Sequence, residues 1–155
     1  MSWTEWTDMY ESFQHWEPAA YRVRLLKDGK SIPMNRVLGP DIQGLLSIGK
    51  TKNIESRRAQ FISGVRNGYG HSEGNLLRLL LLYSGLKERV SPQPQIECQF
   101  LPCKSEDEAI EMEARLLKDY LCRFGELPPL NSAIPNRYEE MTWRLIEAVP
   151  PETST

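Results

Sequence analysis

The stretch Leu45-Leu46-Ser47-Ile48-Gly49-Lys50-Thr51 decides the fold, because an apolar run there ends at a glycine and a lysine. Such a run is typical of a buried strand, and a helix is expected soon after it, over residues 54–65. That helix carries Arg57 and Arg58 on its second turn. Cations and free backbone amides near a helix start are what a phosphate group needs. This segment therefore predicts a strand-helix unit suited to binding a phosphate.

A second strand is expected upstream, over residues 19–25, where apolar and charged side chains alternate. Tyr21, Val23 and Leu25 would share one face of it, and two arginines the other. Asp28-Gly29 then predicts a tight turn. A third strand is expected where Ile96, Cys98 and Phe100 alternate with Gln95, Glu97 and Gln99.

Helices are indicated by capping residues that precede apolar periodicity. Asn53 and Asn75 are placed as N-caps of two helices, the second ending at Gly85. Ser105 and Glu108 form a capping box that opens the longest helix. The expected helices cover residues 54–65, 76–83, 105–124 and 138–148, with a glycine-rich loop over 67–74 and a loop with at most a short strand over 31–43.

Aromatic residues recur near the N-terminus at intervals of three and four. These residues are Trp3, Trp6, Tyr10, Phe13 and Trp16. The spacing predicts a helix with an aromatic stripe, which either docks on the core or forms a surface for a protein partner or a second copy.

These elements predict an α/β fold with a small, mostly antiparallel three-stranded sheet flanked by helices. Three units are expected along the chain. They are an aromatic N-terminal helix over residues 1–17, a main domain over 18–132, and a helix followed by a disordered tail over 133–155.

The composition is that of an ordinary globular domain, with 155 residues of which 40% are hydrophobic and 26% charged. No window of 18 apolar residues occurs, so no membrane span is expected. The N-terminus is aromatic and acidic, and it lacks the basic start and apolar stretch of a signal peptide. We therefore expect a cytoplasmic protein with no membrane partner.

The cysteines and the charge balance exclude little else. The three cysteines, Cys98, Cys103 and Cys122, predict structural thiols, because their number is odd and no Cys/His pair completes a zinc site. The net charge of −2 counts against a dedicated nucleic-acid binder. Most Lys and Arg residues nevertheless fall within residues 20–90, so a basic face remains possible on a near-neutral chain.

Glu113 is the sharpest single signal on the longest helix. It follows Ala109 by four residues and precedes Leu116 and Leu117 by three and four, which places its carboxylate at the edge of the buried stripe. A carboxylate there needs a partner, and a metal ion is a suitable one. The residues alone leave a surface glutamate as the alternative.

The order and spacing of Tyr21, Gly49-Lys50, Arg57, Glu113 and Asn131 resemble those of the GIY-YIG nuclease family. The resemblance covers residues 18–132. The two short motifs of that family read Ala19-Ala20-Tyr21 and Ser47-Ile48-Gly49 in this chain. The second therefore has Ser47 where the family has a tyrosine.

The resemblance implies a role for each matching residue. Glu113 would hold one Mg²⁺ or Mn²⁺ ion, and Arg57 would bind the scissile phosphate and stabilise the transition state. Lys50 would contact the phosphate or orient a hydroxyl, and Tyr21 would take a proton from the attacking water. The substrate is expected to lie against Gly49, Ser47 and Asn131, with Arg58 competing with Arg57 for the phosphate.

Ser47 leaves the identity of the base open, because a serine hydroxyl is not acidic enough to replace a tyrosine. Tyr21 alone supplies the base, or His71 in the glycine-rich loop replaces it, or the chain is inactive. By resemblance we expect a metal-dependent DNA endonuclease of restriction or repair type. The alternative is an inactive module of the same fold that binds DNA or a protein partner.

Overall fold

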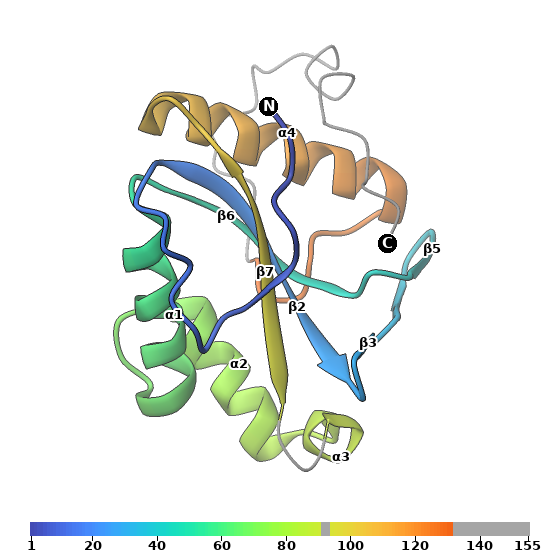
Figure 1. The fold of residues 1–155 in the computed structure, drawn as a ribbon. Helices are drawn as coiled ribbons and strands as arrows, with labels where there is room; N and C mark the ends of the chain where they lie inside the picture. The colour runs from blue at the N-terminus through green and yellow to red at the C-terminus, as the bar shows by residue number, and fades with distance from the viewer. Residues whose placement is uncertain (91–93, 132–155) are drawn as a thin grey trace.

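The computed structural model describes residues 1–90 and 94–131, which form a five-stranded antiparallel sheet flanked by helices (Figure 1). The strands of this sheet are β1 (Thr7–Asp8), β2 (Ala19–Lys27), β3 (Lys30–Ser31), β6 (Leu45–Thr51) and β7 (Gln95–Pro102), and β4 (Met34–Arg36) pairs with β5 (Gly39–Asp41) in a separate hairpin. The helices are α1 (Ile54–Asn67), α2 (Ser72–Tyr83), α3 (Leu86–Val90) and α4 (Glu106–Phe124). The α/β class and the three long strands are as predicted, but the sheet has five strands and not three, because the short strands β1 and β3 also pair with it.

Strand β2 lies at the centre of the sheet. It pairs along nearly its whole length with β7 on one side, and on the other side with β6 and then β3. Asp28 and Gly29, at φ 52° and 75°, form the predicted turn between β2 and β3. The left-handed backbone at both positions matches the twist of the two strands.

Two apolar clusters cover the two faces of the sheet. On one face, Tyr21 and Val23 of β2 pack with Phe61 of α1 and Leu77 of α2. On the other face, Ala20 packs against the apolar side of α4. The alternation predicted for β2 is therefore confirmed, and its odd-numbered residues face α1 and α2.

Helix caps explain where α1 and α4 begin. The side chain of Asn53 accepts a hydrogen bond from the Ser56 amide at 3.0 Å, and that of Ser105 accepts one from the Glu108 amide at 3.2 Å. Glu108 reaches back to the amide of Lys104. The predicted caps are confirmed, and α4 ends at Phe124 because Gly125 adopts the left-handed conformation.

The start predicted for α2 was wrong. The helix begins at Ser72, and its N-cap is His71, not Asn75. The imidazole Nδ1 of His71 accepts a hydrogen bond from the Gly74 amide at 3.2 Å. Histidine is an uncommon N-cap, so the preference for Asn at this position moved the predicted start into the helix.

The predicted N-terminal helix is absent, and this prediction was wrong. Residues 4–9 run along the edge of β7, where Thr7–Asp8 form β1 and Met9 donates to the Ile96 carbonyl at 2.9 Å, and residues 13–17 continue along the start of α1. The guanidinium of Arg22 stacks on Trp3 at 4.1 Å, and that of Arg24 on Trp6 at 4.0 Å. Pairing with the sheet and cation–π stacking therefore decide the conformation, not helical periodicity.

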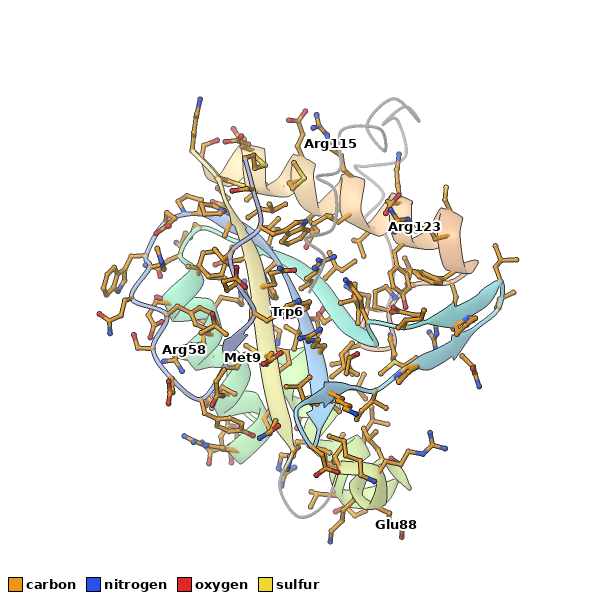
Figure 2. The ribbon with its side chains drawn as sticks, turned by 45° about the vertical axis from the view of Figure 1, so that its right-hand side comes forward. Trp6, Met9, Arg58, Glu88, Arg115 and Arg123 are labelled. Carbon is orange, nitrogen blue, oxygen red and sulfur yellow. The ribbon has the colours of Figure 1, made fainter. Side chains whose placement is uncertain are left out.

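The same segment contributes to both cores, so of the two alternatives the structure shows docking on the core, although not as a helix. Trp3 packs in the cluster under α4, whereas Met9 and Phe13 pack in the cluster under α1 and α2. Figure 2 shows Met9 beside Arg58 of α1, whose Nη1 donates to the Met9 carbonyl at 3.0 Å.

Residues 31–43 contain more strand structure than predicted. The β4–β5 hairpin attaches to the end of α4, because Leu38 donates to the Phe124 carbonyl and Arg36 pairs with Glu126. The helix predicted over residues 138–148 lies outside the described residues. No helix within residues 1–90 and 94–131 is long and apolar enough to cross a membrane.

Candidate active site

The antiparallel pairing of β2 with β6 puts the two motifs beside each other. Tyr21 lies opposite Gly49, and Val23 lies opposite Ser47. Residues directly opposite each other project from the same face of a sheet. Tyr21, Ser47 and Gly49 therefore share the face that is covered by α1 and α2.

Tyr21 is held tightly at this position. Only 3% of the residue is exposed, and a Cβ added at Gly49 would lie 2.4 Å from the Tyr21 hydroxyl. Burial raises the pKa of the phenol well above its usual value, the charge of Glu73 raises it further, and Arg57 opposes them. This direction is opposite to the one that a tyrosine base requires.

Glu73 approaches Ser47 from the first turn of α2. The Ser47 hydroxyl donates to Oε2 of Glu73 at 2.5 Å, and Ser47 is fully buried. Two glycines allow α2 to pack closely on α1, and this packing carries Glu73 toward Ser47. A Cβ at Gly74 would lie 2.4 Å from the Phe61 carbonyl oxygen, and one at Gly64 would lie 2.7 Å from that of His71.

The surroundings of Glu73 favour its protonated form. Burial raises the pKa of this carboxyl to about 7; the charge of Glu113 adds to the rise, whereas the Ser47 hydrogen bond and Arg57 oppose it. Glu73 therefore exchanges a proton near neutral pH, as a general base or acid must do.

Glu113 lies on α4, yet its charge acts on the other side of the sheet. It raises the pKa of both Tyr21 and Glu73. Helix α4 packs against β6, the edge strand that carries Ser47. Glu113 is partly buried on α4, as the pattern of the helix predicts, and its charge reaches Tyr21 and Glu73.

Arg57 and Arg58 have different surroundings. Arg58 pairs with Glu55 at 2.8 Å and anchors the N-terminal segment through the Met9 carbonyl. Arg57 instead lowers the pKa of Tyr21, His71 and Glu73. Its Nε is buried without a hydrogen-bond partner among the described residues. Of the two arginines, only Arg57 therefore faces the candidate site.

His71 is placed to donate a hydrogen bond from its ring, not to accept a proton. Burial lowers the pKa of the imidazole to about 4, with a further contribution from Arg57. The ring is therefore neutral near pH 7. Because Nδ1 accepts the Gly74 amide, the proton of the neutral ring is on Nε2. His71 lacks a free acceptor nitrogen in this state.

Lys50 and Asn131 lie at the border of the site with their polar groups engaged. Lys50 is opposite Ala20, on the α4 face, and its amine pairs with Glu106 at 3.1 Å. The amide of Asn131 binds both backbone groups of Ile48, at 2.9 Å and 2.8 Å. Asn131 thus fastens the segment after α4 to β6, next to both Ser47 and Gly49.

Sequence reasoning missed Glu73. Its segment was interpreted as a glycine-rich loop, and the single available signal was a glutamate in the first turn after a possible cap. The contact with Ser47 joins residues 26 positions apart, and it depends on the close approach of two helices at glycines.

The assembled candidate site is therefore a buried polar cluster with members from two strands and three helices. Its members are Tyr21 of β2, Ser47 and Gly49 of β6, Arg57 of α1, His71 and Glu73 at the start of α2, and Glu113 of α4. Among the residues that the structure describes, no group of three or more His, Cys, Asp or Glu side chains is arranged to hold a metal ion. Comparison with protein-family models, with curated proteins and with solved structures finds no match to this chain.

Proposed function

We propose that this protein is a metal-dependent endonuclease that hydrolyses DNA phosphodiester bonds, as a GIY-YIG-type enzyme of restriction or repair type. The observation that carries the proposal is the convergence of one arginine with two carboxylates in a buried polar cluster. Arg57 and Glu113 both act on Glu73 and Tyr21, although they come from helices on opposite sides of the sheet. This set of groups suits phosphoryl transfer.

Arg57 would bind the scissile phosphate. A guanidinium can pair with two phosphate oxygens at once, and it stabilises the charge that develops as the phosphorane forms. Its buried Nε, which lacks a hydrogen-bond partner within the described part of the chain, is a donor that a phosphate oxygen would satisfy. The neutral His71 supplies a second donor, from the start of α2.

Glu113 would hold the divalent ion, Mg²⁺ or Mn²⁺. Mg²⁺ usually binds through one or two carboxylates and completes its shell with water and substrate phosphate, so a set of three protein ligands is not required. Burial is the main cause of the raised pKa of Glu73, and the charge of Glu113 adds to it, so a cation bound between the two carboxylates would favour their charged forms. When bound, such an ion stabilises the charge on the leaving oxygen.

DNA would reach this cluster past two projecting segments. The α1–α2 loop exposes Tyr69, and the β4–β5 hairpin exposes Val37 and Leu38. Figure 1 shows the hairpin at one side of the molecule and the α1–α2 loop at the other. These segments are the expected source of any preference for a DNA sequence or shape.

An inactive binding module is the second candidate function. The raised pKa of Tyr21 and the replacement of the motif tyrosine by Ser47 favour it, because neither residue then supplies a base. Such a module would retain Arg57 for a phosphate and would bind DNA without cutting it. It would differ from the enzyme in activity and not in fold.

The two functions are separated by incubating the purified chain with supercoiled plasmid in Mg²⁺ and in Mn²⁺. The variants are Glu113→Gln and Arg57→Ala, with Glu111→Gln as the matched control, since Glu111 is exposed on the same helix. We expect nicking by the wild type and by the control, and its loss in the other two variants. A gel shift without cleavage would favour the binding module. The absence of both binding and cleavage would reject both functions.

A further inference from the structure

We propose that Glu73 is the general base of this site and that Ser47 positions it. The proposal rests on the proposed nuclease function. It assigns the proton acceptor to a carboxylate of α2, in place of the tyrosine that the second motif lacks.

The geometry starts from the hydrogen bond between these two residues. Oε2 of Glu73 accepts the Ser47 hydroxyl at 2.5 Å, and Ser47 itself is fully buried. The Oε1 atom of Glu73 makes no hydrogen bond to any residue in the ranges that the structure describes. One carboxylate oxygen is therefore fixed, and the other remains available to a water molecule.

The charged and titratable groups around Glu73 come from three other elements. Arg57 of α1 is a cation, Glu113 of α4 is an anion, and Tyr21 of β2 is a phenol. Burial raises the pKa of Glu73 to about 7; the Ser47 hydrogen bond and Arg57 lower it, and Glu113 raises it. A base with such a pKa is deprotonated often enough near neutrality and still binds a proton strongly.

The other two proton acceptors considered for this site are unsuited to the role. The pKa of Tyr21 is raised well above its usual value, so the phenol keeps its proton. His71 uses Nδ1 as a helix cap and has its pKa lowered to about 4. Within the described residues of the cluster, Glu73 is thus the acceptor that the geometry leaves for the attacking water.

The chemical step balances without any further reactant. The water oxygen forms a bond to phosphorus, and its proton passes to Oε1 of Glu73. The bond between phosphorus and the 3′-oxygen breaks, and its electron pair leaves with that oxygen, which takes a proton from solvent. Glu73 then releases its proton to solvent, and nothing is oxidised or reduced.

The test compares single-turnover cleavage of a labelled duplex by the wild type, Glu73→Gln and Glu88→Gln from about pH 5 to pH 9. Gln keeps an acceptor for the Ser47 hydroxyl but cannot take a proton. We expect Glu73→Gln to cleave roughly 100-fold or more slowly, the usual range for loss of a general base, while its DNA affinity stays within about twofold. Glu88, labelled in Figure 2, serves as the control, because it is exposed on α3, which follows the C-terminal end of α2, whereas Glu73 lies in the first turn of α2.

The pH profile distinguishes a base from a merely structural residue. The wild-type rate should rise with pH as the Glu73 carboxyl loses its proton, with a midpoint below the metal-free value of about 7 because a cation at Glu113 favours the carboxylate, and Glu73→Gln should lose this rise. Ser47→Ala should move the rise to higher pH, because the Ser47 hydrogen bond lowers the pKa of Glu73. This second variant also decides the matter if Glu73→Gln does not fold.

A measurement independent of cleavage follows the Glu73 carboxyl by ¹³C NMR in glutamate-labelled protein without metal. One glutamate signal should titrate near pH 7 in the wild type and be missing in Glu73→Gln. Full activity of Glu73→Gln with an unchanged pH profile would overturn the assignment and leave the nuclease intact. A wild type that does not cleave would reject the nuclease and the base together.

Discussion

The hydroxyl of Tyr21 lies directly over the α-carbon of Gly49, its partner across β2 and β6, so that a Cβ at Gly49 would be 2.4 Å from the hydroxyl oxygen. Real side chains do not approach so closely. The glycine of the second motif is therefore required by the tyrosine of the first one. The two motifs form one packing unit before any chemistry is considered.

We predict that Gly49→Ala destabilises the fold by about 1–3 kcal/mol, the usual cost of overpacking. The buried Tyr21 ring cannot rotate away, and the added methyl group would also meet its Cζ at 2.5 Å. Gly85→Ala is the control, because a Cβ there meets no atom within 4 Å. Urea unfolding followed by fluorescence measures both variants. Equal midpoints would show that the strand accommodates the methyl group.

A second prediction concerns the glycine contact that brings Glu73 to Ser47. Gly74→Ala would put a Cβ 2.4 Å from the Phe61 carbonyl oxygen. This oxygen belongs to the backbone of α1, so it cannot move aside as the end of a flexible side chain can. We expect α2 to move away from α1 and the Ser47–Glu73 hydrogen bond to lengthen or break. Loss of the glutamate ¹³C titration near pH 7, in protein that is still folded by circular dichroism, would report this movement. An unchanged titration would contradict it.

Asn131 provides a third prediction. Its side chain makes two hydrogen bonds to the backbone of Ile48, and each is worth about 1 kcal/mol. Asn131→Ala should lower the free energy of unfolding by roughly 2 kcal/mol, whereas Asn35→Ala, at an exposed position, should change it little. Thermal unfolding compares the two. If Asn131→Ala instead weakens DNA binding at unchanged stability, Asn131 contacts the substrate and does not merely anchor β6.

The sequence predicts some elements of the fold and not others. Local signals were sufficient where one segment determines its own structure, as in the alternation of β2, the Asn53 cap and the Ser105 cap. They failed for residues 1–17, because pairing with β7 and stacking of tryptophans on arginines depend on a distant strand. The aromatic residues of this segment do recur at intervals of three and four, yet no helix forms there.

The candidate site shows the same division. The positions of Tyr21, Gly49 and Glu113 relative to the elements could be predicted, since a strand or helix face follows from spacing. The choice of Arg57 over Arg58 came from the resemblance and not from the residues alone, because it depends on Glu55 and on the Met9 carbonyl holding Arg58. Glu73 could not be predicted either, because its partner is fixed by the packing of α2 on α1.

A fourth prediction follows from two opposite pKa shifts. The pKa of Glu73 is raised from 4.5 to about 7, so the folded state holds a proton that the unfolded state has released. This contribution to stability is lost as pH rises from about 4.5 to 7. The pKa of His71 is lowered from 6.5 to about 4, so the unfolded state binds the extra proton. Its contribution therefore falls as pH drops from about 6.5 to 4.

The two slopes oppose each other between about pH 4.5 and 6.5, and single variants should separate them. Glu73→Gln should leave the slope of His71, so that the free energy of unfolding rises with pH. His71→Asn keeps a good N-cap and should leave the slope of Glu73, with the opposite sign. Each effect is expected to be on the order of 1–3 kcal/mol. Urea unfolding in EDTA at several pH values measures them, and parallel curves for both variants would contradict the assignment.

The last prediction restores the tyrosine of the second motif. Ser47 is fully buried and its hydroxyl is 2.5 Å from Glu73, so a tyrosine at position 47 has no room while that carboxylate is present. Ser47→Tyr alone should therefore lower stability by about 1–3 kcal/mol and abolish the pH profile attributed to Glu73.

Ser47→Tyr combined with Glu73→Ala removes the clash and supplies a phenol in its place. We expect the double variant to be more stable than Ser47→Tyr alone, by urea unfolding. We also expect its cleavage rate to rise only at higher pH, because a phenol has a higher pKa than a carboxyl group near 7. If the double variant is no more stable than Ser47→Tyr, Glu73 does not occupy the space of the missing ring.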